Sequence, residues 1–174
     1  MKMESNHKRC FVLMPFSKSS KKHTQEYWDN HYENSLKPLI EECGNLEAFR
    51  SRPLRQDILR QIINDLVFSH IVVADLTDHN SNVYWELGIR QSFRHGTITI
   101  AESGSKIPFD IKTKGVLFYT LKDLKEGTDF ANQFKAAILD CGTNPNRPDS
   151  VVLETITGRG SIYSVIHHEA SSKS

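Results

Sequence analysis

Apolar and polar positions along the chain follow two different periods, and the change from one to the other predicts where the elements lie. Strands that alternate with helices predict a parallel sheet, because each parallel connection needs a crossover. We therefore expect an α/β fold, a doubly wound, five-stranded parallel sheet with helices on both faces. Short runs of consecutive apolar residues, typical of buried strands, occur at 10–14, 46–49, 71–74, 97–101 and 116–119. Apolar residues that recur every three or four positions, typical of one helix face, occur at 24–43, 58–67, 82–95 and 123–139.

Proline and glycine residues predict where several of these elements end. Pro15 directly follows the first apolar run and should close that strand, because proline has no N–H to donate to a neighbouring strand. Gly44 and Gly142 follow two of the helical patterns, and each is expected to stop its helix. His95 and Gly96 should break the preceding helix in the same way.

One domain is expected at 9–141, followed by a linker and tail at 142–174. A length of 174 residues fits one compact domain with a substantial core. The stretch at 144–150 is rich in proline and asparagine, which predicts a linker, and the serine-rich end at 171–174 predicts a tail without regular structure. The segment at 151–166 alternates weakly between apolar and polar residues, so it is either a hairpin or the start of a further region.

Charge and composition are those of an ordinary soluble protein. The chain has 22 Lys and Arg against 21 Asp and Glu, a formal net charge of +1, with 38% hydrophobic and 25% charged residues. The chain has no large excess of positive charge that would favour binding to nucleic acid. No window of the sequence approaches the ~18 apolar residues of a membrane span. The basic tract at 18–23 could meet a phosphate, although such a short run is more often a solvated loop. We expect neither a membrane nor a nucleic-acid partner.

Cysteine and histidine positions argue against disulfides, metals and cofactors. Cys10, Cys43 and Cys141 are odd in number and widely spaced, with no Cys-x-x-Cys pair. His167 and His168 are adjacent and point in opposite directions, so we expect no metal there. Glycine-rich dinucleotide, Walker and Gly-x-Ser-x-Gly motifs are absent, which argues against redox chemistry, phosphoryl transfer and α/β-hydrolase activity. We expect no cofactor, no metal and a reducing, cytoplasmic location.

Glu86 is the residue that least fits its surroundings. At about 100° per residue, the helix at 82–95 carries Glu86 inside an apolar arc. An ionised carboxylate there is costly unless it is paired or opens into a cleft, so Glu86 is a functional candidate. The alternative is an i,i+4 pair with Arg90, worth only about 0.2–0.5 kcal/mol. The arc comprises Val83, Trp85, Leu87, Ile89 and Phe93.

Polar residues follow the ends of the predicted strands, which is where ligands sit in open α/β sheets. Asp75 ends the third strand, and it is either a catalytic carboxylate or a turn residue. Asn80, Ser81 or Asn82 can cap the next helix, which leaves Glu86 about one turn from a helix N-terminus whose dipole favours the anion. We therefore predict Glu86 and Asp75 as the catalytic residues.

Four segments together resemble one known family. They lie at 12–16, 71–77, 82–88 and 107–110, and they read Val-Leu-Met-Pro-Phe, Ile-Val-Val-Ala-Asp-Leu-Thr, Asn-Val-Tyr-Trp-Glu-Leu-Gly and Ile-Pro-Phe-Asp. In this combination the chain resembles the nucleoside 2-deoxyribosyltransferase-like family and, more loosely, the TIR domains. The resemblance covers roughly 9–141, and it is most specific in the Asp-Leu-Thr and Asn-Val-x-x-Glu-Leu-Gly pair. It implies a flavodoxin-like or TIR-like three-layer sandwich.

The resemblance implies cleavage of an N-glycosidic bond. In the family a glutamate at the position of Glu86 attacks the anomeric carbon and forms a covalent sugar ester, as in retaining glycosidases. An aspartate at the position of Asp75 helps the leaving base or holds the sugar. TIR-type enzymes likewise use a glutamate to cleave the nicotinamide bond of NAD. The family's transferases commonly have a tyrosine near the first strand, where Phe16 has no hydroxyl, so hydrolysis is expected over base exchange.

The resemblance also implies the substrate, the partners and the remaining site residues. The expected substrate is a nucleoside, a nucleotide or NAD. A homo-oligomer is expected by analogy, because active sites of the family are often completed by a neighbouring subunit. The alternative is a module without catalysis, which binds a nucleotide signal or assembles as TIR domains do. The substrate-binding residues are expected to be Met14, Pro15, Phe16, Ser17, Thr77, Asn82 and Asp110.

Overall fold

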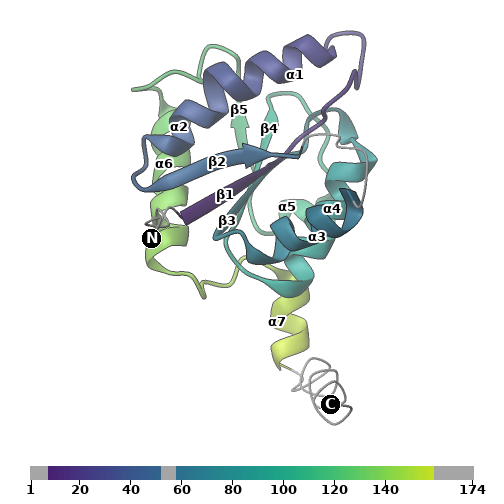
Figure 1. The fold of residues 1–174 in the computed structure, drawn as a ribbon, viewed down its shortest axis with the longest axis vertical. Helices are drawn as coiled ribbons and strands as arrows, with labels where there is room; N and C mark the ends of the chain where they lie inside the picture. Colours follow the sequence, from purple (N-terminus) through teal and green to yellow (C-terminus); the bar gives the residue numbers. More distant parts are fainter. Residues whose placement is uncertain (1–7, 52–57, 159–174) are drawn as a thin grey trace, which may run out of the picture.

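The computed structural model of the chain describes residues 8–51 and 58–158, and it contains one five-stranded sheet (Figure 1). The strand order is β2-β1-β3-β4-β5, and every neighbouring pair is parallel. The predicted five-stranded parallel sheet is therefore confirmed. The strands are β1 (Lys8–Leu13), β2 (Leu46–Arg50), β3 (Ile71–Asp75), β4 (Thr97–Glu102) and β5 (Leu117–Tyr119).

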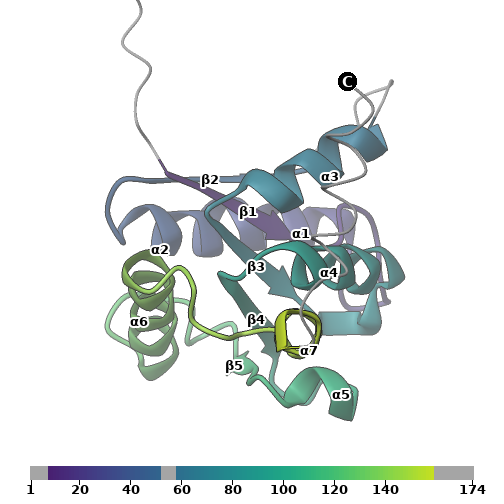
Figure 2. The same cartoon turned by 90° about the horizontal axis from the view of Figure 1, so that it is seen from below.

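Helices cover both faces of the sheet, as predicted for a doubly wound fold (Figure 2). Helices α1, α2 and α6 lie on one face, and α3 and α4 lie on the other. Within the described ranges, no helix combines the length and the apolar character needed to cross a membrane. The helices are α1 (Gln25–His31), the π-helical turn η1 (Tyr32–Leu36), α2 (Lys37–Glu41), α3 (Ile58–Phe68), the 3-10 turn η2 (Thr77–His79), α4 (Ser81–Phe93), α5 (Phe109–Lys112), α6 (Asp129–Thr143) and α7 (Val151–Gly158).

An apolar core forms on each side of the sheet, because successive side chains of a strand point to opposite faces. In β1, Cys10 and Val12 belong to the core under α1, α2 and α6. Phe11 and Leu13 belong to the core under α3 and α4. Strand β3 is buried along its whole length, as expected for a central strand of a parallel sheet.

The last predicted helix differs from the observed α6 at both ends. It begins at Asp129 and not at 123, because the side chain of Thr128 accepts a hydrogen bond from a backbone N–H of the first turn. The helix then runs on to Thr143, so the predicted stop at Gly142 is wrong. A glycine inside a helix costs only about 1 kcal/mol relative to alanine, which the packing of α6 offsets.

A hairpin was one of the two alternatives left open for 151–166, and it is excluded for the part that the structure describes, because α7 is a helix that packs against α4. Residues 159–166 lie outside the described residues. The stretch predicted as a linker is held by polar contacts. Asp149 accepts hydrogen bonds from the backbone of β4, and the hydroxyl of Ser150 donates to the Gln91 carbonyl at 2.6 Å. Hydrophobic periodicity carries no information about such contacts.

Helix α4 buries only part of the predicted apolar arc. Val83 and Leu87 are 1% exposed and face the core, but Trp85 and Phe93 are 51% and 53% exposed. The aromatic half of the predicted arc therefore points outward. The N-terminal cap is Asn80, whose side chain accepts hydrogen bonds from the N–H groups of residues 82 and 83, so a capping role for Asn82 is excluded.

Candidate functional site

A pocket of about 360 Å³ lies where β3 and β4 end, at the carboxyl edge of the sheet. This is the edge at which open α/β sheets bind their ligands. The loop after β1 contributes one residue, and the last residue of β4 and the segments that follow β3 and β4 contribute the others. The pocket is lined by His23, Thr77, Asp78, His79, Glu102, Ser103, Gly104, Ser105 and Lys106.

His23 is held between two carboxylates. Its Nδ1 lies 2.6 Å from Oδ2 of Asp78, and its Nε2 lies 2.9 Å from Oε2 of Glu102 without the alignment of a hydrogen bond. The side chain is only 3% exposed. Lys22 also pairs with Glu102. An imidazole and two acids therefore meet at the pocket, although they come from three separate segments.

Asp78 ties the loop after β1 to the loop after β3. The hydroxyl of Ser19 donates to its Oδ2 at 2.7 Å, beside the contact with His23. Burial alone would raise the pKa of Asp78, but hydrogen bonds from Ser19, Ser20 and His23 outweigh it and hold the pKa below its usual range. The sheet order reverses between β1 and β3, so these contacts span the switch point of the fold.

The backbone is strained at the same place. Asp78 has φ 63° and His79 has φ 53°, so two consecutive residues with side chains adopt the left-handed region. This region is uncommon for residues other than glycine, and strain of this kind gathers at ligand sites and switches. The left-handed turn lies directly beside the pocket, since both residues line it.

Asp75 is fully buried, and its carboxylate is fully engaged. Oδ2 accepts a hydrogen bond from the Tyr119 hydroxyl at 2.7 Å and lies 3.0 Å from Nε2 of His31, and Oδ1 accepts from the Thr77 N–H at 3.0 Å. Burial and the nearby Asp75 raise the pKa of Tyr119, which keeps its hydroxyl as the donor. Thr77 in turn accepts from the Glu102 N–H through its hydroxyl. Asp75 thus holds Thr77, which lines the pocket, but does not line the pocket itself.

Glu86 is half-buried and has no ion-pair or hydrogen-bond partner among the described residues. Burial raises its pKa to about 7. The alternative pairing with Arg90 is absent, because the Arg90 guanidinium donates to backbone carbonyls, among them those of Leu66 and Ser69. Glu86 does not line the pocket at the carboxyl edge of the sheet. No hydrogen bond or ion pair among the described residues links Asp75 to Glu86, so these contacts do not join the two predicted catalytic residues in one site.

The predicted substrate-binding residues follow β1 and β3 or lie in the first turns of α4 and α5. Thr77 lines the pocket, but the other six do not. Met14 and Pro15 are buried, whereas Phe16 and Ser17 are exposed at the end of β1. Asn82 and Asp110 are exposed in the first turns of α4 and α5.

Sequence reasoning missed most of the pocket. His23, Asp78, His79, Glu102 and Lys106 line it, and none was predicted as a site residue. Each lies within a few positions of a strand end or a helix start, which is the one signal that could have found them. In the described part of the chain, no three His, Cys, Asp or Glu side chains are arranged to hold a metal ion.

Comparisons with known proteins do not identify the site. No model of a known protein family matches the chain, and no curated protein matches it.

Proposed function

We propose that the chain cleaves the N-glycosidic bond of a nucleoside, a nucleotide or NAD, with Glu86 as the nucleophile and water as the favoured acceptor. The observation that carries the proposal is the state of Glu86, which is half-buried, unpaired among the described residues and has a pKa raised to about 7 by burial. A carboxylate that is poorly solvated when ionised is an effective nucleophile. The segments that resemble nucleoside 2-deoxyribosyltransferases support the same reaction.

The reaction has two steps. A carboxylate oxygen of Glu86 forms a bond to the anomeric carbon while the carbon–nitrogen bond breaks, and the electron pair leaves with the base. A purine or pyrimidine takes up a proton from solvent as it leaves, whereas nicotinamide leaves neutral without one. Water then attacks the anomeric carbon of the sugar ester, loses a proton, and releases Glu86 as a carboxylate.

Asp75 has an orienting role in this proposal. Its oxygens are occupied by Tyr119, His31 and the backbone of Thr77, so it holds the end of β3 in place without contacting the substrate. The pocket beside Thr77 is the proposed place for polar groups of the substrate, because it offers carboxylates, an imidazole and Lys106. Sugar hydroxyls are suited to such a mixture of donors and acceptors.

A screen for released base tests the proposal. Purified protein is incubated with a panel of nucleosides, nucleotides and NAD, and free base is measured by chromatography. We expect release by wild type, a loss of about 100-fold or more in Glu86→Gln, and no change in Glu47→Gln, which alters an exposed glutamate of β2. The rate should rise with pH through about 7, because the nucleophile must be ionised. Equal release by wild type and Glu86→Gln would contradict the proposal.

A second candidate function is binding of a nucleotide signal without turnover. Two observations favour it. Glu86 does not line the pocket at the carboxyl edge, and both carboxylate oxygens of Asp75 are already engaged by protein groups. Calorimetry separates the two functions, since a module of this kind binds a nucleotide from the panel while no base is released. A TIR-like assembly role is favoured by the exposed Trp85 and is tested by the oligomeric state of Trp85→Gln.

We also propose a homo-oligomer in the cytoplasm. Large apolar side chains exposed on α3 and α4, namely Leu59, Phe68 and Trp85, support self-association. Cys10, Cys43 and Cys141 are free thiols, which supports a reducing compartment. Light scattering coupled to size-exclusion chromatography measures the oligomeric state, and a monomer at all concentrations would contradict it.

A further inference from the structure

His23 joins three segments at the carboxyl edge of the sheet. It lies in the loop after β1, and its Nδ1 is 2.6 Å from Oδ2 of Asp78 in the segment after β3. Its Nε2 is 2.9 Å from Oε2 of Glu102, the last residue of β4. The side chain of His23 is only 3% exposed, so water competes little for either contact. Neither step of the proposed reaction uses His23.

The two contacts of His23 together require the charged form of the ring. An imidazolium has two N–H groups and can face a carboxylate on each side, whereas a neutral imidazole has one N–H and one lone pair. In the neutral ring, one nitrogen would place its lone pair against a carboxylate oxygen 2.6 or 2.9 Å away. Such a contact is repulsive, because both atoms carry negative partial charge.

The charges around the ring also favour the imidazolium. Asp78 and Glu102 contribute two negative charges, and Lys22, which pairs with Glu102, contributes one positive charge. A positive His23 brings the sum over these four groups to zero. A neutral His23 leaves an excess of one negative charge between carboxylates that are only 17% and 13% exposed.

The other titratable groups near His23 do not supply this charge. The Tyr27 ring of α1 packs on the imidazole with 4.4 Å between the ring centroids, and burial raises the pKa of Tyr27, so its hydroxyl stays neutral. His79 and Lys106 line the same pocket, but no hydrogen bond or ion pair among the described residues joins either of them to His23. The protonation of His23 therefore decides the charge of the cluster.

The contact with Asp78 is the stronger of the two. Burial alone would raise the pKa of Asp78, but hydrogen bonds from Ser19, Ser20 and His23 hold it below its usual range, so this carboxylate stays an ionised acceptor. Nε2 lies close to Glu102 but lacks the alignment of a hydrogen bond. A neutral ring should therefore keep its proton on Nδ1 and lose its contact with Glu102.

We propose that His23 is a pH-sensitive clamp on Glu102. At low pH the imidazolium holds the Glu102 carboxylate against the loop after β1. When the pH rises and Nε2 loses its proton, the carboxylate is repelled and turns away from the ring, while the hydrogen bond to Asp78 remains. Lys22 is 61% exposed, so its pair with Glu102 is screened and does not replace the clamp. Since Glu102 lines the pocket, the open clamp gives the pocket a carboxylate that His23 no longer holds.

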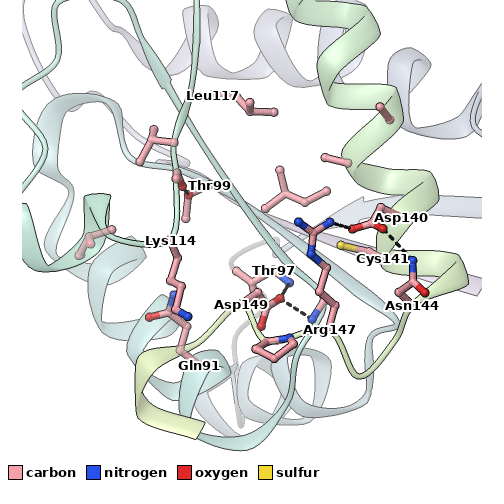
Figure 3. Close-up of a pocket in the computed structure, with 18 residues that line it drawn as sticks. Gln91, Thr97, Thr99, Lys114, Leu117, Asp140, Cys141, Asn144, Arg147 and Asp149 are labelled. Atoms are coloured by element: carbon pink, nitrogen blue, oxygen red, sulfur yellow. Dashed lines mark hydrogen bonds and ion pairs between the residues drawn. The ribbon is translucent and has the colours of Figure 1, made fainter. Parts of the chain in front are cut away.

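A second histidine and aspartate provide an internal control. Nδ1 of His95 lies 2.9 Å from Oδ1 of Asp149, which lines a separate cavity of about 600 Å³ beside β4 and α6 (Figure 3). The other carboxylate oxygen of Asp149 accepts hydrogen bonds from the backbone N–H groups of Gly96 and Thr97, each at 2.6 Å. A neutral His95 can still donate to Asp149 from Nδ1, and the backbone holds Asp149 in either case.

NMR spectroscopy of the full chain from about pH 5.5 to about pH 9, where imidazoles titrate, tests the clamp. The ring ¹⁵N shifts report the protonation of His23, and the side-chain carboxyl ¹³C shift reports Glu102. We expect both signals to change with one common midpoint. The nuclear Overhauser effect between the ring protons of His23 and the γ-protons of Glu102 should be present at low pH and lost at high pH.

Variants separate the clamp from a passive contact. Glu102→Gln places an amide beside the ring, which can accept from an imidazolium or donate to a neutral imidazole, so the Overhauser effect should persist over the whole range. His23→Gln should remove the change in the Glu102 signal. His95→Gln and Glu86→Gln should both respond as wild type.

The proposal is overturned if the Glu102 carboxyl shift stays constant while the His23 ring titrates, or if the Overhauser effect persists once the ring is neutral. A ring that does not titrate in this range would overturn it too, because the clamp would not respond to pH. The same holds for an unchanged response of Glu102 in His23→Gln. Since Glu86→Gln removes the proposed reaction and leaves the clamp intact, the failure of one proposal is distinguishable from the failure of the other.

Discussion

Arg90 and Glu86 lie one turn apart on α4, and both place a charge at least partly out of water. Arg90 is 0% exposed, and its guanidinium donates to the carbonyls of Leu66 and Ser69 at 2.6 and 2.9 Å and to three further carbonyls, of His70, His95 and Gly96. Burial and the nearby Arg94 lower its pKa to about 10, which leaves it a cation at neutral pH. Glu86 has no such partner among the described residues, and burial raises its pKa to about 7.

The difference separates a structural charge from a functional candidate. The Arg90 guanidinium satisfies the carbonyls at the ends of α3 and α4, so its removal leaves several buried acceptors without a donor. Glu86 forms no hydrogen bond or ion pair with any described residue, and burial disfavours its ionised form. Burial alone does not show what a charged residue does; its partners decide it.

Removal of Arg90 should have the largest effect. We expect Arg90→Met to destabilise the protein by about 3–5 kcal/mol, because the buried carbonyls lose their donors. Urea unfolding followed by circular dichroism measures the change. Arg90→Lys should recover only part of it, since a compact ammonium cannot reach carbonyls on several segments at once. If Arg90→Met were as stable as wild type, Arg90 would not be a structural charge, and the contrast with Glu86 would be wrong.

The two faces of α4 should respond very differently to truncation. Leu87→Ala removes a side chain that is 1% exposed and should cost about 2–4 kcal/mol. Trp85→Ala removes one that is 51% exposed and should cost less than about 1 kcal/mol. The same unfolding experiment compares both variants. A larger loss of stability in Trp85→Ala than in Leu87→Ala would show that α4 buries the aromatic arc that periodicity predicted.

Asp75 provides a buried acid that is paired, in contrast to Glu86. Asp75→Asn places an amide N–H₂ where donors from Tyr119, His31 or Thr77 now point, and we expect a loss of about 1–3 kcal/mol. Tyr119→Phe removes one donor and should cost about 1 kcal/mol. A double-mutant cycle should show coupling between the two positions, and additive losses would argue against the network.

The pH dependence of Glu86 should be the smallest effect. Its pKa is raised from 4.5 to about 7 on folding, so the folded state binds the proton more tightly. Its contribution is therefore fully present below about pH 4.5 and is lost as the pH rises through about 7. After allowance for its partial exposure, we expect wild type to lose on the order of 1 kcal/mol more than Glu86→Gln between pH 5 and pH 8. Parallel pH profiles for the two proteins would contradict a desolvated Glu86.

The sheet could be predicted from the sequence, because the signal for a buried strand is local. Strands β1 and β3 are covered on both faces, and their apolar runs identify them without knowledge of their neighbours. The last two helices were harder, since α6 starts at the Thr128 cap and α7 follows Ser150, which accepts a hydrogen bond from the Leu153 N–H. Each of these helix starts depends on a single polar contact, which an average of hydrophobicity over a window of residues does not detect.

The pocket could be predicted only in part. Thr77 follows a strand end and was found, but His23 meets Asp78 across 55 positions of sequence. No spacing rule connects residues that far apart, because the sheet order alone brings the loops after β1 and β3 together. The left-handed backbone at Asp78 and His79 has only a weak sequence signal, since aspartate and histidine adopt this region more often than most residues but neither is a glycine.

By itself, the sequence determined the order of strands and helices, the parallel sheet and the presence of an acid within an apolar stretch of α4. The tertiary structure decided which face of α4 is buried, that Arg90 pairs with carbonyls and that Glu86 pairs with no described residue. The physical reason is that periodicity depends on neighbours along the chain. Solvation and pairing of a charge depend on atoms that other segments bring to it, and these exist only once the chain has folded.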